Sequence, residues 1–304
     1  MDFSSALPTF VVTLREGTEA ALVVGIVLAY LKKAAQTRLN PWVFAGIAAG
    51  MVGSLGVGVL FNGLLAALET SDQASAPIVK QLLEAGFGVI AIGLLSWMLI
   101  WMTQQARQLK SEVEGAITSA LQQGNQAGWG VFSLVTIAVL REGFETVVFI
   151  AAQFQQGWIP AVGALAGLVG ATLIGFLLFR LGVKINLRQF FQVMGVLLLL
   201  IVSGLVVSAL RHFDQAATLY SQFSETTNLC FSTDSCILGS QVWDLSTILP
   251  DRQFPGILLK AFLGYTQKLY LLQAIGYLAF LTTVGTLYLR SVTGQPGATR
   301  SAVS

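Results

Sequence analysis

Seven long apolar segments constrain the fold of this chain more than any other feature of the sequence. Each has at least the roughly 20 residues that a helix needs to cross about 30 Å of hydrocarbon. Only 11% of the residues are charged, against about a quarter in soluble proteins. The sequence therefore predicts an all-α polytopic membrane protein with seven transmembrane helices, at residues 8–31, 42–66, 82–102, 131–154, 160–180, 190–210 and 257–289.

The basic residues between the spans predict the orientation of the chain. Ten of them follow spans one, three, five and seven: Lys32, Lys33, Arg38, Arg107, Lys110, Arg180, Lys184, Arg188, Arg290 and Arg300. Five lie on the opposite side: Lys80, Arg211, Arg252, Lys260 and Lys268. Because loops rich in Lys and Arg stay in the cytoplasm, we expect the N-terminus outside and the C-terminus in the cytoplasm. The net charge of +2 gives no indication of a nucleic-acid partner.

Two segments differ in composition from the spans. Residues 211–256 form a sizeable external loop that holds both cysteines, Cys230 and Cys236. On the oxidising side of a membrane such a pair favours a small disulfide loop, with two free thiols as the alternative. Residues 291–304 are polar, and we expect a disordered cytoplasmic tail there. Residues 1–290 are predicted to form the transmembrane domain.

A motif with one arginine and two glutamates occurs twice in the chain. "LREGTEA" stands at residues 14–20 and "LREGFET" at residues 140–146, an offset of 126. Each copy is followed by a GxxxGxxG pattern, which lets membrane helices approach closely; its glycines are Gly46, Gly50 and Gly53, then Gly163, Gly167 and Gly170. This order predicts duplication of a three-helix unit, at about residues 8–102 and 131–210. The seventh helix, at residues 257–289, stands outside the repeat, and Lys260 and Lys268 indicate that its outer third is either interfacial or broken.

The odd number of helices in each unit has a consequence for topology. The first span then runs inward and the fourth outward, so the two halves are inverted repeats. Secondary transporters often have this arrangement, with a substrate site near the midplane between the halves. We therefore expect the two motifs to face each other near the centre of the bilayer. Charged residues also interrupt the first span, which lacks a basic start, so we do not interpret it as a cleavable signal peptide.

The motif residues predict a cation site. On a helix, Arg15, Glu16 and Glu19 lie within an arc of about 100° and about 15 Å into the first span. The second copy repeats this geometry in the fourth span with Arg141, Glu142 and Glu145. A charge at this depth costs at least about 2.5–3.5 kcal/mol and normally marks a substrate path. Four glutamates and two arginines sum to −2, and Glu84, near the outer end of the third span, makes the sum −3.

Carboxylate oxygens suit hard cations, so ferric iron, ferrous iron, manganese, magnesium and calcium all fit the chemistry. A soft-metal site is disfavoured because His212 lies at a helix end, where we expect the headgroups, and the cysteines lie in the external loop. Two other interpretations of the motif are salt bridges that set the helix register and a proton relay. The sequence shows no nucleophile–base pair of the kind that would indicate an enzyme. Trp97 and Trp101 are interpreted as interfacial anchors.

The two motif segments, "LREGTEAALVVGIVLAYL" and "LREGFETVVFIAAQF", resemble the paired R-E-G-x-E helices of the high-affinity iron permease family. This family comprises oxidase-dependent fungal iron permeases and related bacterial iron transporters. The segment "LLEAGFGVIAIGLLSWMLIWM" is similar to the third helix of the family. The resemblance covers most of residues 1–210 and is looser beyond.

The resemblance implies a seven-helix iron importer of the plasma (inner) membrane, with ferric iron as the favoured substrate and no permanently bound cofactor. It implies iron-binding carboxylates at Glu16, Glu19, Glu142, Glu145 and Glu84, with Arg15 and Arg141 as motif partners. Fungal members act with an external ferroxidase and some bacterial ones with periplasmic partners, so we expect a ferroxidase or an iron-delivery protein as a partner. The alternative function is a proton-coupled carrier of another divalent metal or a small solute.

Overall fold

The structure is a computed structural model that describes residues 6–69, 76–105, 109–122, 126–152, 158–179, 186–223, 230, 235–251 and 253–293. The long helices are α1 (Ala6–Lys33), α2 (Asn40–Glu69), α3 (Ala76–Gln105), α5 (Ala127–Ala152), α6 (Ile159–Phe179), α7 (Leu187–Phe223) and α9 (Leu271–Thr293). The short elements are η2 (Thr37–Leu39), α4 (Leu109–Gln122), α8 (Gly256–Leu263), β1 (Gln241–Asp244) and β2 (Lys268–Tyr270).

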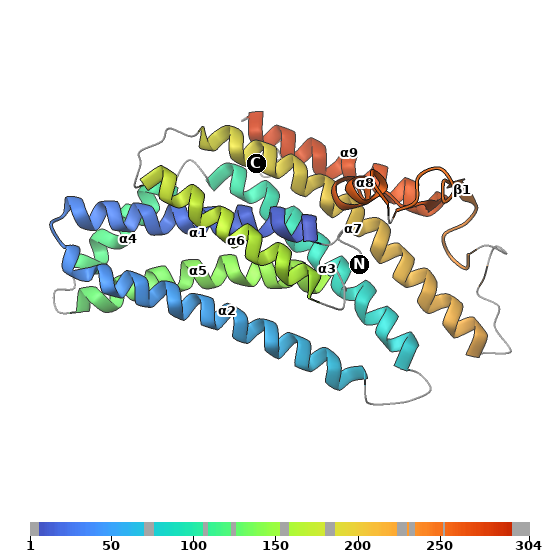
Figure 1. The fold of residues 1–304 in the computed structure, drawn as a ribbon, viewed down its shortest axis with the longest axis horizontal. Coiled ribbons are helices and arrows are strands. Elements are labelled where there is room, and N and C mark those ends of the chain that lie inside the picture. Colours follow the sequence, from blue (N-terminus) through green and yellow to red (C-terminus); the bar gives the residue numbers. More distant parts are fainter. Residues whose placement is uncertain are drawn as a thin grey trace, which may run out of the picture.

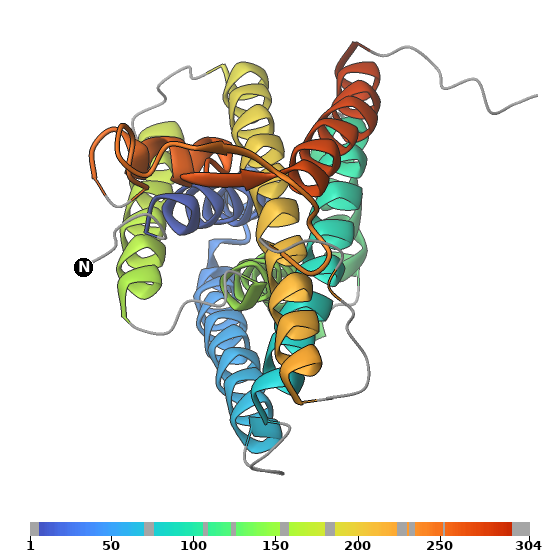
Figure 2. The same cartoon turned by 90° about the vertical axis from the view of Figure 1, so that its right-hand side faces the viewer.

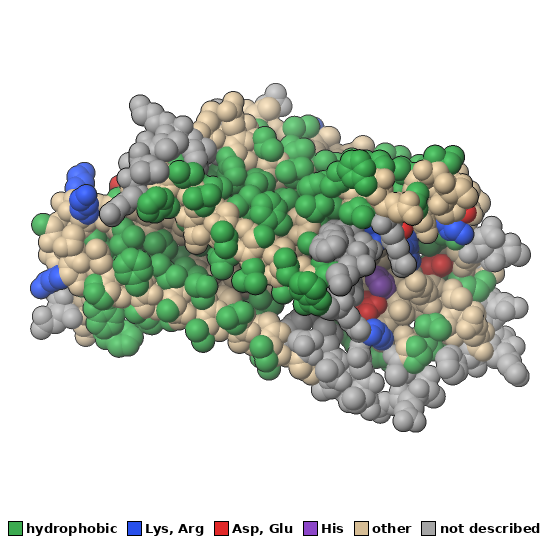
Figure 3. All heavy atoms as spheres, in the orientation of Figure 1, with side chains coloured by type: hydrophobic (Ala, Val, Ile, Leu, Met, Phe, Trp, Pro, Cys, Tyr) green, Lys and Arg blue, Asp and Glu red, His purple; other side chains and the backbone are tan. Residues whose placement is uncertain are grey.

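The long helices confirm an all-α polytopic membrane protein. Within the described residues, five segments are long and apolar enough to cross a membrane: Thr37–Leu60, Pro77–Trp101, Ile159–Phe179, Gln189–Gln222 and Leu271–Thr293. Helices α1 and α5 fall outside this group because each carries the three charges of a motif. Hydrophobic side chains cover much of the face drawn in Figure 3, and basic side chains stand at the end where α1 leads into α2.

The long helices alternate in direction along the chain (Figure 1). Helix α1 runs from right to left in this view, and α5 runs the opposite way, so the helices that carry the two motifs are antiparallel. Helix α5 contacts α1 directly, and α3 packs along α7. The two motifs therefore reach the same region of the bundle from opposite directions.

Glycines bring two pairs of helices into close contact, α1 with α6 and α2 with α5. A Cβ atom added at Gly50 would lie 2.7 Å from Val139 Cβ, and one added at Gly167 would lie 2.7 Å from the carbonyl oxygen of Phe10. Both distances are below van der Waals contact, so only glycine permits these backbones to approach so closely. In a bilayer, packing of this kind replaces the hydrophobic attraction that joins helices in water.

The two sets of glycine contacts repeat at constant sequence offsets, and the partners of the glycines share the offset of the motifs. Gly46, Gly50, Gly53 and Gly58 face Phe132, Val139, Leu140 and Val147, while Gly163, Gly167, Gly170 and Gly175 face Ala6, Thr13, Leu14 and Ala21. The glycines differ by 117 positions (163 − 46) and their partners by 126 (139 − 13). Each contact of α2 with α5 thus has an equivalent contact of α6 with α1.

The seventh predicted span, 257–289, is broken in its outer third, as Lys260 and Lys268 indicated. The chain forms the short helix α8, turns at Gly264 with φ of 66°, and passes through β2 before α9 begins at Leu271. A left-handed residue ends an α-helix, and glycine adopts this conformation without steric cost. Because the run is almost continuously apolar, its hydropathy does not show at which residue the helix breaks.

The predicted external loop is partly ordered. Helix α7 continues to Phe223, beyond the expected end of its span at residue 210. Strand β1 pairs antiparallel with β2, and Cys230 and Cys236 form a disulfide. The predicted disordered tail lies outside the described residues from position 294 onward.

Helix α4 was not predicted. It packs against α1 and α5, with Val113 and Ile117 buried in the contact. These residues are spaced i, i+4, which is the signal of an amphipathic helix.

Replacing Gly50 by leucine should destabilise the protein, because the side chain would enter the space that Val139 fills. Overpacking of this kind costs typically about 1–3 kcal/mol. Gly56, on the same helix, is a matched control because a Cβ atom there meets nothing within 4 Å. Thermal unfolding of the purified proteins in detergent should show a lower midpoint for Gly50→Leu than for Gly56→Leu. Equal midpoints would contradict the close contact of α2 with α5.

Candidate metal site

Three of the predicted carboxylates meet in the structure. Glu16 and Glu19 come from the middle of α1 and Glu142 from the middle of α5. One carboxylate oxygen of each lies within 4.8 Å of the others. Ligands on opposite sides of an octahedral cation lie about 4.2 Å apart, given metal–oxygen distances of about 2.1 Å. The three side chains, here called the carboxylate cluster, therefore fit around one small hard cation with minor adjustment.

Arg15 holds the carboxylates of its own motif. Its Nη1 lies 2.6 Å from Glu16 Oε1, and its Nη2 lies 3.3 Å from Glu19 Oε1. The Arg15 side chain is only 4% exposed, and both glutamates are buried as well. Each of these buried charges has an opposite charge beside it. Burying one of them without its partner would cost much free energy.

The second motif is arranged differently. Arg141 Nε lies 3.3 Å from Glu145 Oε1, and the Arg141 side chain is 44% exposed. Its guanidinium carbon lies 4.6 Å from the centre of the Trp101 ring on α3, which is a cation–π contact. Arg141 therefore binds Glu145 and an aromatic face, and Glu142 is left to the carboxylate cluster.

Several carboxylate oxygens of the two motifs have no hydrogen-bond partner among the described residues. These buried atoms are Glu16 Oε2, Glu19 Oε1, Glu142 Oε2 and Glu145 Oε2. Glu19 Oε1 does lie at ion-pair distance from Arg15. A buried acceptor without a partner costs about 1–3 kcal/mol, more when charged. A cation would satisfy several of these oxygens at once, so the donor set fits a metal ion.

Glu84 does not join the carboxylate cluster. Its Oε2 lies 3.0 Å from His212 Nδ1 on α7, and the same nitrogen lies 2.7 Å from Gln81 Oε1. Figure 3 shows the histidine beside acidic side chains in a hollow of the surface. Glu84 therefore occupies a separate polar site between α3 and α7.

Sequence reasoning missed two residues beside the motifs. Met98 Sδ accepts a hydrogen bond from Arg15 Nη1 at 3.7 Å. Trp101 stacks on Trp97, with ring centres 5.9 Å apart, and also contacts Arg141. Trp101 was interpreted as an interfacial anchor, yet it faces a motif arginine. The sequence feature that could have identified Trp101 is its i, i+3 spacing from Met98, which puts both side chains on one face of α3.

A comparison with protein families identifies the chain. The model of the iron permease FTR1 family matches residues 6–291. The chain belongs to the iron permease FTR1 family. This confirms the resemblance seen in the paired motifs, and it indicates a membrane permease for iron rather than an enzyme.

Curated relatives of this FTR1-family chain cover nearly its whole length. An uncharacterized protein of Synechocystis is 50% identical over 301 residues, which is 98% of this chain and 97% of the relative. The ferrous iron permease EfeU of Escherichia coli O157:H7 is 34% identical over 260 residues, 85% of this chain and 86% of the relative. EfeU of Yersinia pseudotuberculosis is 32% identical over 267 residues, with 87% and 85% covered. No solved structure matches the chain.

The unequal burial of the two arginines predicts unequal effects of the same substitution. Arg15→Gln removes the partner of two buried glutamates, and breaking a buried pair costs about 3–5 kcal/mol. Arg141→Gln removes a partly exposed pair worth about 0–1 kcal/mol. Thermal unfolding in detergent should therefore show a much larger loss for Arg15→Gln. Equal losses would show that the two motifs are buried to the same degree.

Proposed function

We propose that this protein imports iron through the carboxylate cluster between α1 and α5. The observation that carries the proposal is the meeting of Glu16, Glu19 and Glu142 from two antiparallel helices. Iron transport is the function of the family, and hard oxygen ligands from carboxylates suit both iron ions. Glu145 is proposed as a fourth carboxylate, because its buried Oε2 lacks a partner among the described residues.

We further propose that the chain consists of two inverted three-helix repeats and a seventh helix. The equivalent contacts of α1 with α6 and of α5 with α2 support the duplication. The opposite directions of α1 and α5 support the inversion (Figure 1). In this topology α1 and α5 cross the membrane, with the N-terminus outside and the C-terminus inside, in a bacterial-type plasma membrane. The basic residues at the end of α1 support this orientation.

The geometry suggests how the arginines act as iron passes. An incoming cation competes with Arg15 for the oxygens of Glu16 and Glu19, so the ion pairs must loosen as metal ligation forms. Arg141 already shares its charge between Glu145 and the Trp101 ring. Release of Glu145 therefore leaves Arg141 with an aromatic partner, which lowers the cost of freeing that carboxylate.

We propose ferrous iron as the transported form, although ligand hardness favours the ferric ion. The support is the name of the EfeU relatives, which are ferrous iron permeases. Oxidation or delivery of iron would fall to a separate external protein. The single histidine of the chain, His212, pairs with Glu84, so the external loop offers no histidine for a copper oxidase centre.

Changing Glu19 of the carboxylate cluster, or Glu145 as the proposed fourth carboxylate, should strongly reduce transport without unfolding the protein. Glu19→Gln and Glu145→Gln each remove a charged ligand but keep the size of the side chain. Iron uptake into proteoliposomes should fall at least about tenfold, the effect of losing about 1.4 kcal/mol of binding. Glu114→Gln, on α4 and outside the cluster, should transport normally. Normal uptake by the Glu19 and Glu145 variants would remove the cluster from the transport path.

The oxidation state can be tested in the same proteoliposomes. Uptake of labelled iron should be fast when ascorbate keeps it ferrous and slow when a ferric chelate replaces it. Preference for the ferric chelate would restore the ferric substrate that the family resemblance implied. Excess manganese or magnesium, or an imposed proton gradient, separates iron import from a proton-coupled carrier of another ion. If manganese reduced the uptake of labelled iron as strongly as unlabelled iron does, the result would favour a carrier of another ion.

A further inference from the structure

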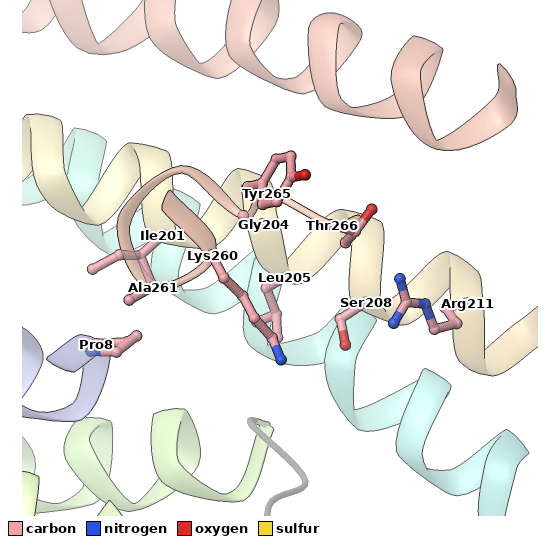
Figure 4. Close-up of a pocket in the computed structure, with 11 residues that line it drawn as sticks. Pro8, Ile201, Gly204, Leu205, Ser208, Arg211, Lys260, Ala261, Tyr265 and Thr266 are labelled. Atoms are coloured by element: carbon pink, nitrogen blue, oxygen red, sulfur yellow. The ribbon is translucent and has the colours of Figure 1, made fainter. Parts of the chain in front are cut away.

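A second polar site lies far along the chain from the motifs. A pocket of about 110 Å³ opens between α7 and the turn that follows α8, with Pro8 of α1 at its edge (Figure 4). Two basic residues line it, Arg211 from α7 and Lys260 from α8. This is unusual, because a pocket in an apolar bundle would be expected to carry few charges.

Two glycines build the pocket by bringing α8 against α7. A Cβ atom added at Gly204 would lie 2.5 Å from Gly264 Cα, so the two backbones touch. Gly264 also has φ of 66° and ends α8, its N–H donating to the carbonyls of Leu259 and Lys260. Any larger residue at either position would separate the helices. The contact fixes Lys260 beside the stretch of α7 that carries Arg211.

The two basic residues of the pocket differ in their ion pairs. Lys260 Nζ lies 3.7 Å from Asp251 Oδ2, a long ion pair. No carboxylate of the described residues lies within ion-pair distance of Arg211. The pocket is therefore lined by two cationic side chains, and one of them, Arg211, has no carboxylate at ion-pair distance among the described residues.

The side chains of the pocket divide into two groups. All three of Lys260, Ser208 and Arg211 line the pocket, and Figure 4 shows the Lys260 ammonium and the Ser208 hydroxyl below α7 with the Arg211 guanidinium level with that helix. The hydroxyls of Tyr265 and Thr266 lie on the other side, where they donate to the carbonyls of Leu249 and Lys268. The first group therefore presents donors to one shared space, while the second serves the fold of the turn.

We propose that this pocket binds an oxyanion, with a carboxylate or phosphate group held by Arg211 and Lys260. A guanidinium offers paired N–H donors that match two oxygens of such a group, and an ammonium adds a point charge. Ser208 supplies a further donor. This proposal does not rest on iron transport, because none of the three residues belongs to the carboxylate cluster.

Two sources of an oxyanion fit the position of the pocket. Pro8 in the first turn of α1 lines it, and Figure 2 shows α8 beside the start of α1, at the end of the bundle that we propose to face outside. A soluble anion, such as phosphate or a carboxylate that accompanies iron, would reach it from the external solution. The phosphate of a lipid headgroup would reach it from the outer leaflet. Both present the same charged oxygens to Arg211.

Binding to the purified full-length protein tests the proposal. In non-ionic detergent, phosphate or citrate should raise the unfolding midpoint in a saturable way, compared with chloride at equal ionic strength. For the lipid arm, native mass spectrometry should show retained phosphatidylglycerol. Arg211→Gln should weaken binding of whichever oxyanion is held by at least about tenfold, while Lys268→Gln should leave it unchanged. Lys268 is the matched control because it pairs with Asp244 outside the pocket.

The result also identifies the source. Stabilisation by free phosphate or citrate that depends on Arg211 assigns a soluble anion, and loss of phosphatidylglycerol in Arg211→Gln alone assigns a lipid. Lys260→Gln provides the same test if Arg211→Gln does not yield folded protein. The proposal is overturned if neither anion nor lipid depends on Arg211 or Lys260. Iron uptake measured separately shows whether the carboxylate cluster works regardless of that outcome.

Discussion

The burial of Arg15 between Glu16 and Glu19 is the interaction on which the rest of the site depends. Without it, two carboxylates would stand in the middle of an apolar helix with no compensating charge. With it, the first motif carries one net negative charge, and Glu142 from α5 adds a second to the same small volume. These charges favour the packing of α1 against α5, because the buried charges of each helix then lie beside polar groups of the other.

The glycine contacts allow each motif helix to pack closely against a neighbouring helix. Helix α1 can approach its neighbours only if their surfaces carry no side chains at the crossing, which Gly163, Gly167 and Gly170 of α6 provide. The same arrangement is repeated for α5 by the glycines of α2. The charged residues explain why the helices must meet, and the glycines explain how closely they meet.

Much of this could be predicted from the sequence because its signals are local or periodic. The apolar runs, the two motifs and the glycine patterns each depend on residue spacing alone. The two lysines of the last span indicated that its outer third is interfacial or broken, but the position of the break at Gly264 could not be predicted, since one glycine within an apolar run is compatible with a continuous helix. Helix α4 was overlooked because a short amphipathic segment between long spans has a weaker signal than they do.

The unequal burial of Arg15 and Arg141 could not be predicted from the sequence, for another reason. The two motifs are nearly identical, so their unequal burial comes from tertiary neighbours, Met98 for one and Trp101 for the other. Glu84 was grouped with the motif acids by resemblance, whereas the packing of α3 on α7 places it beside His212. Local patterns identify charged residues but not which distant helix will face them.

The glycine contacts have a mechanical consequence for the carboxylate cluster. Each tightly joined pair contains one motif helix and one glycine helix: α1 is joined to α6, and α5 to α2. The cluster therefore spans the seam between two interlocked bodies rather than lying within one of them. Shear along that seam would change the separation of Glu19 from Glu142 while leaving every glycine contact intact. The carboxylate cluster is thus divided between two pairs of helices that the glycine contacts do not join to each other.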